Sequence, residues 1–136
     1  MSEYHAPVKE MLFVLRHLAE LPAIGRLPGY EDASEDLVEA VLNEAAQLAA
    51  NVIAPTNRIG DAQGTRVENG QVVVPAEFTA AYREFVDGGW TGLSLNPDHG
   101  GQGLPYVLGV AVEEMWQAAN LAWSLGPLLT QGAARA

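Results

Sequence analysis

The sequence predicts an all-α fold with one short β-hairpin. Apolar residues recur at intervals of three and four in four or five separate stretches, as in helices that bury one face. Between two short valine-containing runs stands Asn69-Gly70, the dipeptide most typical of a hairpin turn. With 136 residues and no cysteine, the chain has the size of one domain that folds without disulfides.

Two helices are expected in the first 55 residues. The first lies within APVKEMLFVLRHLAEL, where Pro7 suits a first helical turn. The second lies within SEDLVEAVLNEAAQLAANVIAP, with Asp32 or Ser34 as its cap and Pro55 as its expected end. The predicted buried faces are Val8, Met11, Leu12, Leu15 and Leu18 in the first helix, and Leu37, Val38, Val41, Leu42, Ala45, Leu48, Ala49 and Val52 in the second.

The second half of the chain predicts helices separated by a corner. Pro75 opens one helix, which Gly88-Gly89 ends. The stretch GWTGLSLNPDHGGQGLP then reverses the chain, with Trp90 and Leu93 packed into the core. Pro105 opens the next helix, Asn120 marks a break, and another helix follows from about Leu121. The predicted buried faces are Phe78, Ala81, Tyr82 and Phe85 in the first of these helices, and Val107, Leu108, Ala111, Val112 and Met115 in the next.

The charge balance argues against several classes of partner. The net charge is −10, from 17 acidic and 7 basic residues, and the bases form no patch that could follow a phosphate backbone. No uninterrupted apolar run approaches the roughly 18–20 residues that cross a bilayer, and the first residues do not resemble a signal peptide. We therefore expect a cytoplasmic protein that binds neither nucleic acid nor membrane.

The glycine-rich stretch does not match a known phosphate or nucleophile motif. In HGGQG the third glycine of a dinucleotide loop is replaced by Tyr106. In GLSLN, around Ser94, the last glycine of a nucleophile elbow is replaced by Asn96. We expect these glycines to serve backbone angles and close approach rather than chemistry.

No catalytic, cofactor-binding or metal-binding residue is predicted from the pattern itself. His5, His17 and His99 lack a partner at metal-ligand spacing. Trp116 and Trp123 lie seven residues apart, so they could share one helical face. Core packing is the expected role of these tryptophans, and lining a ligand cavity is the alternative.

The corner and the helix after it carry a family resemblance. GWTGLSLNPDHGGQGLP followed by VEEMWQAANLAWSL resembles the amino-terminal helical domain of acyl-CoA dehydrogenases. That family has a G-W-x-G-L turn, a proline, then G-G-x-G-L-P and a helix with two glutamates. The resemblance covers about residues 37–130. The matching residues are Gly89, Trp90, Gly92, Leu93, Pro97, Gly100, Gly101, Gly103, Leu104, Pro105, Glu113 and Glu114.

The first residues extend the resemblance to one subgroup. YHAPVKEMLFVLRHL is similar to the extra amino-terminal segment of a longer subgroup, which includes methylthiopropanoyl-CoA dehydrogenase. The resemblance thus implies an extension helix and linker over residues 1–33 and the helical domain over 34–136. A β domain and a carboxy-terminal helical domain would belong to a longer protein.

The resemblance implies a division of labour within such a protein. FAD and the catalytic glutamate would lie mostly in the other two domains, where an α-proton is removed while a hydride passes to the flavin. The substrate would be an acyl-CoA, with an electron-transfer flavoprotein as electron acceptor and a homo-oligomer as the full-length state. This chain, inactive alone, would wall the acyl cavity through Trp123, Gly126 and Thr130, and would expose apolar surface where the other domains dock. The alternative is a non-catalytic helical interaction module.

Overall fold

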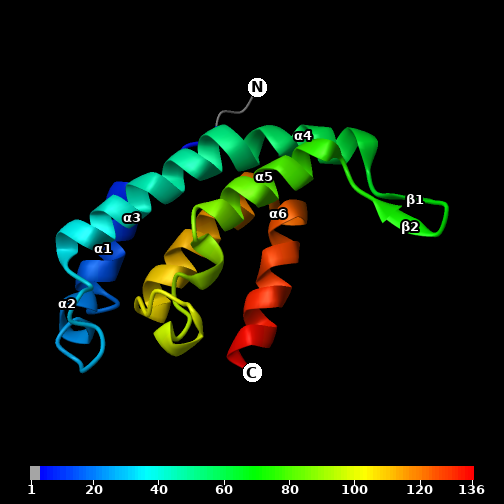
Figure 1. Cartoon of the computed structure of the whole chain (residues 1–136). Coiled ribbons are helices and arrows are strands. Elements are labelled where there is room, and N and C mark those ends of the chain that lie inside the picture. Colours follow the sequence, from blue (N-terminus) through cyan, green and yellow to red (C-terminus); the bar gives the residue numbers. More distant parts are fainter. Residues whose placement is uncertain (1–3) are drawn as a thin grey trace.

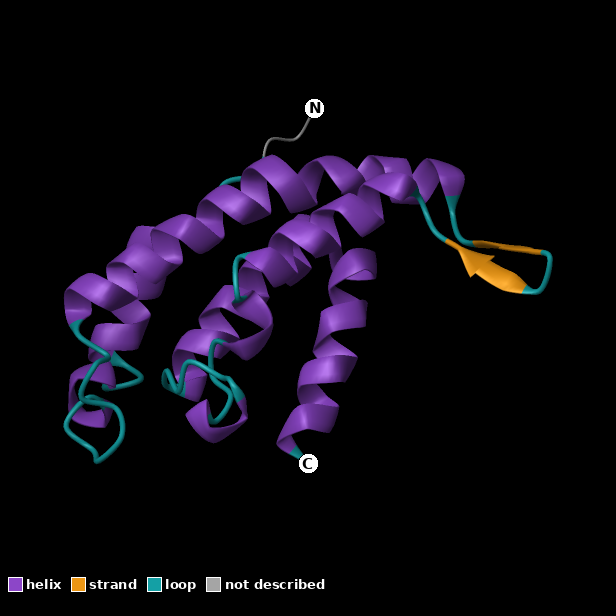
Figure 2. Ribbon diagram, in the orientation of Figure 1, coloured by secondary structure: helices purple, strands orange, loops and turns teal. Residues whose placement is uncertain are grey.

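The computed structural model describes residues 4–136 and confirms the all-α fold with one hairpin (Figure 1). Helices form one curved body, and the hairpin extends from one end of it (Figure 2). The elements in order are α1 (Val8–His17), α2 (Leu21–Ile24), α3 (Glu35–Leu48), the π-helix η1 (Ala49–Ile53), α4 (Ala54–Gln63), β1 (Arg66–Glu68), β2 (Gln71–Val73), α5 (Ala76–Asp87), the 3₁₀ turns η2 (Trp90–Gly92) and η3 (Pro97–His99), and α6 (Tyr106–Arg135).

Helix α1 begins one residue later than its proline suggested, because Pro7 is the N-cap rather than the first helical residue. Met11 and Leu15 are buried as predicted. The prediction for Leu18 is wrong, since its side chain is 71% exposed. The helix ends at His17, so Leu18 lies at the C-cap and no longer follows the buried stripe.

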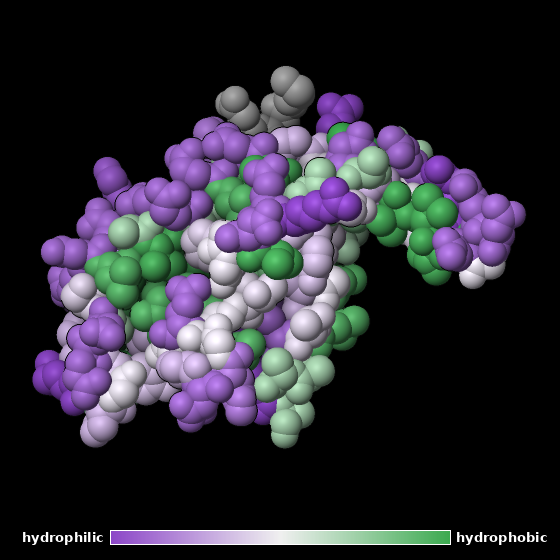
Figure 3. All heavy atoms as spheres, viewed as in Figure 1, coloured by the Kyte–Doolittle hydropathy of each residue, from purple (hydrophilic) through white to green (hydrophobic). Residues whose placement is uncertain are grey.

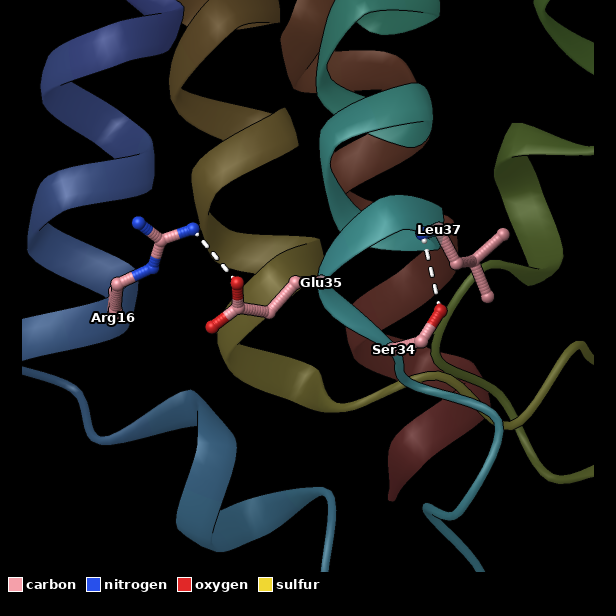
Figure 4. Close-up of polar contacts among 4 residues, drawn as sticks. All are labelled: Arg16, Ser34, Glu35 and Leu37. Carbon is pink, nitrogen blue, oxygen red and sulfur yellow. Dashed lines mark hydrogen bonds and ion pairs between the residues drawn. The ribbon is translucent and has the colours of Figure 1, made fainter.

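Ser34, not Asp32, caps α3 (Figure 4). The backbone N–H of Leu37 donates to Ser34 Oγ at 3.2 Å, which satisfies one of the free donors of the first turn. Beside this cap, Arg16 of α1 donates to Glu35 at 2.9 Å. Both side chains of the pair are largely exposed, so the ion pair contributes little to stability.

The prediction that Pro55 ends the second helix is wrong. A proline has no N–H and its ring crowds the carbonyl four residues earlier. The π-helix η1 lies directly before Pro55, and there the N–H of Ala54 bonds to the carbonyl of Ala49, five residues back. This wider turn shifts the hydrogen-bond register at the proline, and the helix continues to Gln63.

The resulting helix from Glu35 to Gln63 is longer than the sequence suggested. Its 29 residues include an 18-residue window of mean hydropathy 1.2, which by length and composition alone would be enough to cross a membrane. A core helix of a soluble protein meets the same criterion. The inner face of this helix packs into the core, where Val38, Leu42, Ala45, Ala49 and Ile53 are at most 1% exposed. The prediction that Leu37 is buried is wrong, since its side chain is 37% exposed on the flank of this stripe, about 100° from Val38.

The hairpin forms at the predicted dipeptide. Strands β1 and β2 pair antiparallel with Val67 opposite Val72. Asn69 and Gly70 have φ of 51° and 78°, the left-handed values that a tight hairpin turn requires. Val67 and Val72 are 71% and 69% exposed, so this face of the hairpin is largely open to solvent.

Helices α5 and α6 complete the core. Ala81 and Phe85 of α5 are buried as predicted, whereas Tyr82, on the flank of that stripe, is 39% exposed. Gly88 ends α5 as expected, and Gly89 follows with a φ of 76°. In α6 the predicted face is confirmed, with Leu108, Ala111, Val112 and Met115 buried and Val107 partly buried.

The predicted break in α6 is sharper than the sequence suggested. Asn120 has φ −159° and ψ 96°, values outside any helix. A straight helix of 30 residues would be about 45 Å long. Instead the guanidinium carbon of Arg135, in the last turn, lies 4.3 Å from the centre of the Tyr106 ring in the first turn. Helix α6 therefore folds back on itself, and its last part runs beside the rest of the body (Figure 1).

Candidate functional site

The C-terminal arm of α6, residues 121–135, carries the three predicted cavity residues. Trp123 is 4% exposed, while Gly126 and Thr130 are exposed. Gly126 and Thr130 are four residues apart and so lie one above the other on one side of the helix. No neighbouring heavy atom lies within 4 Å of a Cβ built on Gly126, so this side of the arm is open. The structure thus separates Trp123, which faces the core, from the other two.

Trp123 belongs to an aromatic cluster centred on Phe85. The rings of Trp116 and Trp123 meet that of Phe85 edge to face, with centroids 5.9 and 5.4 Å away, and Trp90 packs on Trp116 in the same manner at 5.4 Å. The indole N–H of Trp123 donates to the carbonyl of Phe78 at 3.2 Å. Core packing is therefore confirmed for both tryptophans of α6. Lining of a ligand cavity by Trp123 stays a prediction.

The open side of the arm is apolar. Leu121, Leu125 and Leu129 follow one another at every fourth residue and are 58%, 49% and 73% exposed. The space-filling view shows hydrophobic atoms along this part of the molecule and at the hairpin (Figure 3). A row of exposed leucines beside Gly126 and Thr130 is the kind of surface that marks an interface or a ligand wall.

Two buried polar residues join the kink of α6 to α4. Asn120 and Thr56 are 1% and 4% exposed. The Asn120 amide donates to Thr56 Oγ1 at 2.8 Å, and the Thr56 hydroxyl donates to the carbonyl of Ile53 at 2.7 Å. The Asn120 side-chain oxygen accepts from the backbone N–H of Trp123 at 3.1 Å and so caps the arm. The sequence predicted the break at Asn120 but not the role of Thr56. The only signal for Thr56 was a polar residue directly after Pro55.

Backbone groups of the glycine-rich corner are hydrogen-bonded to one another. Backbone N–H groups of Gly101, Gln102 and Gly103 donate to the carbonyls of Asn96, Gly92 and Leu95 at 3.1, 2.8 and 3.0 Å. These donors are therefore not free to hold a phosphate. The expected packing of Trp90 and Leu93 into the core is confirmed, since Leu93 is 6% exposed and Trp90 packs on Trp116.

We assign no catalytic set among the titratable groups of residues 4–136. The Ser94 hydroxyl accepts from Arg135 at 3.1 Å. Within residues 4–136, Glu113 Oε1 is buried without a hydrogen-bond partner. No three His, Asp or Glu side chains of this described part gather closely enough to hold a metal ion. Burial raises the pKa of the Tyr4 phenol, and the charge of Glu114 raises it further.

A groove separates α1 from the first half of α6. Its volume is about 250 Å³, and its wall is mainly apolar, with Glu10 and Glu114 at the rim. The lining residues are Pro7, Glu10, Met11, Val14, Leu15, Ala19, Val107, Val110, Ala111 and Glu114. None of the three predicted cavity residues lines this groove, so it is separate from the surface on the arm.

Comparison with known proteins identifies a relative but no matching family model. The 3-methylmercaptopropionyl-CoA dehydrogenase of Ruegeria pomeroyi is 42% identical over 130 residues, which are 96% of this chain. The chain spans 22% of the length of that relative. Methylmercapto and methylthio name the same substituent, so the relative comes from the subgroup that the sequence resembles. The resemblance to acyl-CoA dehydrogenases is therefore confirmed over nearly the whole chain.

Proposed function

We propose that this chain is the amino-terminal helical part of an FAD-dependent acyl-CoA dehydrogenase that introduces a double bond between Cα and Cβ of an acyl-CoA thioester. The single observation that carries the proposal is the 42% identity over 130 residues to a protein named 3-methylmercaptopropionyl-CoA dehydrogenase. Identity at this level over 96% of the chain indicates common descent rather than a shared helical scaffold alone.

We assign no part of the flavin site to the described residues. The backbone N–H groups from Gly100 to Leu104 are already paired within the chain, so they are not available to bind the pyrophosphate of FAD as a phosphate loop would. No step of the reaction is therefore assigned to a residue of this chain. Flavin and catalytic base would come from the parts of the enzyme that resemble the remaining length of the relative.

The proposed contribution of this chain is a wall. Gly126 and Thr130 lie on the open side of the arm, next to the exposed leucine row Leu121, Leu125 and Leu129. Small residues beside large apolar ones would leave space for an acyl chain and exclude water from it. Exclusion of water matters because electrostatic stabilisation of the enolate is stronger in a dry site.

The leucine row is also the proposed docking surface for the rest of the enzyme. Exposed contiguous apolar surface on a protein of this size usually marks an interface. We further propose an electron-transfer flavoprotein as electron acceptor, a homo-oligomeric full-length state and a cytoplasmic location. These follow from the family resemblance and from the acidic, cysteine-free composition of the chain.

Flavin absorbance of the natural full-length protein tests the proposal. We expect a yellow protein whose flavin band bleaches without oxygen when a suitable acyl-CoA is added. The panel should include a thioether acyl-CoA, because the relative is named for one, together with straight acyl chains of increasing length. A colourless protein, or a flavin that no acyl-CoA bleaches, would contradict the proposal and favour a non-catalytic helical interaction module.

A further inference from the structure

Helix α6 reverses its direction at a single residue. The sequence on both sides favours a helix, since Ala118, Ala119, Leu121 and Ala122 are all good helix formers. Local propensity alone would carry the helix straight through. Yet the backbone of Asn120 is extended, and the two ends of α6 meet where Arg135 covers the ring of Tyr106. Something other than local propensity must therefore hold the reversal.

The side chain of Asn120 makes a different bond with each of its two polar atoms. Its oxygen accepts from Trp123 N–H, three residues along, which starts the arm. Its amide donates to Thr56 Oγ1, 64 residues away in sequence, which ties the start of the arm to α4. Thr56 is in turn oriented by its hydroxyl bond to the Ile53 carbonyl, at the end of the π-helix.

Burial makes the loss of either hydrogen bond costly. Both side chains are nearly inaccessible to water, so an atom that loses its protein partner finds no replacement. Contacts at the far end of the arm differ, because Tyr106 is 53% exposed and the Arg135 side chain lies at the surface. Exposed cation–π contacts are weak. The buried hinge, rather than the exposed tip, is placed to control the direction of the arm.

We propose that Asn120 and Thr56 form a clamp that sets the direction of residues 121–135. The clamp would thereby position Gly126, Thr130 and the leucine row relative to the rest of the domain. That these residues wall an acyl cavity rests on the proposed function, whereas the direction of the arm does not. Asn120 and Thr56 are thus positioning residues that need not touch any ligand.

A distance measurement across the hinge tests the clamp in the full chain. The chain has no cysteine, so cysteines introduced at Val110 and Ala134 would be the only sites for spin labels. In a straight helix these positions would be about 36 Å apart, because 24 residues separate them at about 1.5 Å each. The folded-back arm should instead give one short, narrow distance, measured by electron paramagnetic resonance.

Variants of the clamp should change that distance. Thr56→Val keeps the size of the side chain and removes the acceptor of the Asn120 amide, while Thr56→Ser keeps the hydroxyl and serves as the matched control. We expect Thr56→Ser to match the unsubstituted chain. Thr56→Val should add a longer, broader population, and Asn120→Ala, which also removes the cap, should shift more of the distribution toward 36 Å.

Thr56→Val decides the question even where Asn120→Ala prevents folding, since only one hydroxyl is replaced by a methyl group. Far-UV circular dichroism establishes that each labelled variant retains its helices. A folded Thr56→Val chain with the same distance and width as Thr56→Ser would overturn the proposal, and would mean that apolar packing of Trp123 on Phe85 sets the arm. That outcome would leave the dehydrogenase proposal untouched, since the latter depends on flavin bleaching in the full-length protein.

Discussion

Substitution of Gly101 by alanine should destabilise the domain more than any other single methyl group added to a glycine of the corner. A Cβ built on Gly101 would lie 2.1 Å from the backbone oxygen of Leu95 and 2.3 Å from its carbonyl carbon. Ordinary contact begins near 3.4 Å, so one backbone segment must retreat by about 1.3 Å. Backbone on both sides of the contact is fixed by hydrogen bonds, and neither segment can yield without losing some of them.

The magnitude follows from the bonds at stake. The Leu95 carbonyl accepts from the N–H of Gly103. The N–H groups of Gly101 and Gln102 donate to the carbonyls of Asn96 and Gly92. Each such bond contributes about 0.5–1.5 kcal/mol net, so loss of all three costs about 1.5–4.5 kcal/mol. A chain of this length has about 7–20 kcal/mol of folding free energy, so the variant should remain folded but clearly weakened.

Urea unfolding followed by circular dichroism is the assay, with the free energy extrapolated to zero denaturant. Two other glycines provide matched controls. Gly132→Ala adds a methyl group to an open surface of α6, with no proline after it, and should stabilise by about 0.5–1 kcal/mol. Gly100→Ala meets no atom within 4 Å but has a φ of +83°, so it should cost about 1–2 kcal/mol.

The expected order of stability, from highest to lowest, is therefore Gly132→Ala, the unsubstituted chain, Gly100→Ala and Gly101→Ala. If Gly101→Ala unfolds within about 0.5 kcal/mol of the unsubstituted chain, the argument from close backbone approach is refuted. Gly101 does not have a positive φ, so a loss of stability at this position reports the close approach to Leu95 and not left-handed backbone strain. Because all of these variants add the same methyl group, differences among them report the surroundings of each glycine.

Three further outcomes are expected. Ser34→Ala should lower the free energy of unfolding by about 1 kcal/mol in the same urea assay, because Ser34 Oγ accepts a hydrogen bond from the first turn of α3. Asp32→Ala should leave the free energy unchanged, and equal effects of the two variants would contradict the assigned cap. Because the pKa of Tyr4 is raised above its ordinary 10.0 in the folded state, the unfolded chain loses this proton first as the pH rises. Stability should therefore be unaffected by Tyr4 below pH 10 and fall above it, and Tyr4→Phe should reduce this fall; an unchanged alkaline slope would disprove the effect. Replacement of Leu125 and Leu129 together by glutamine should reduce self-association and binding of a hydrophobic dye, both measured at constant protein concentration, and unaltered dye binding would show that the leucine row is not the exposed apolar surface.

Much of the candidate site was foreseeable because its signals are local. The break at Asn120 and the burial of Trp123 follow from residue type and spacing within one stretch of chain. The family resemblance selected Gly126 and Thr130, and the structure shows only that both lie on the open side of the arm. Thr56 was not foreseeable as a partner of Asn120, since no local pattern joins residues 64 positions apart.

The sequence by itself determined the class of fold and most helix limits. Periodic apolar residues, the capping serine, the Asn69-Gly70 turn and the glycines after α5 each act through the few residues next to them. Such signals can be recognised without knowing what packs against them.

Only the tertiary structure decided how these elements continue and face one another. Pro55 stands inside a helix because the π-helix before it shifts the hydrogen-bond register, and the packed inner face of α3 and η1 favours that continuation over a break. Helix α6 folds back because a buried amide of Asn120 finds its acceptor on α4. The physical reason is the same in both places: a local preference is overruled when buried groups far apart in the chain satisfy each other.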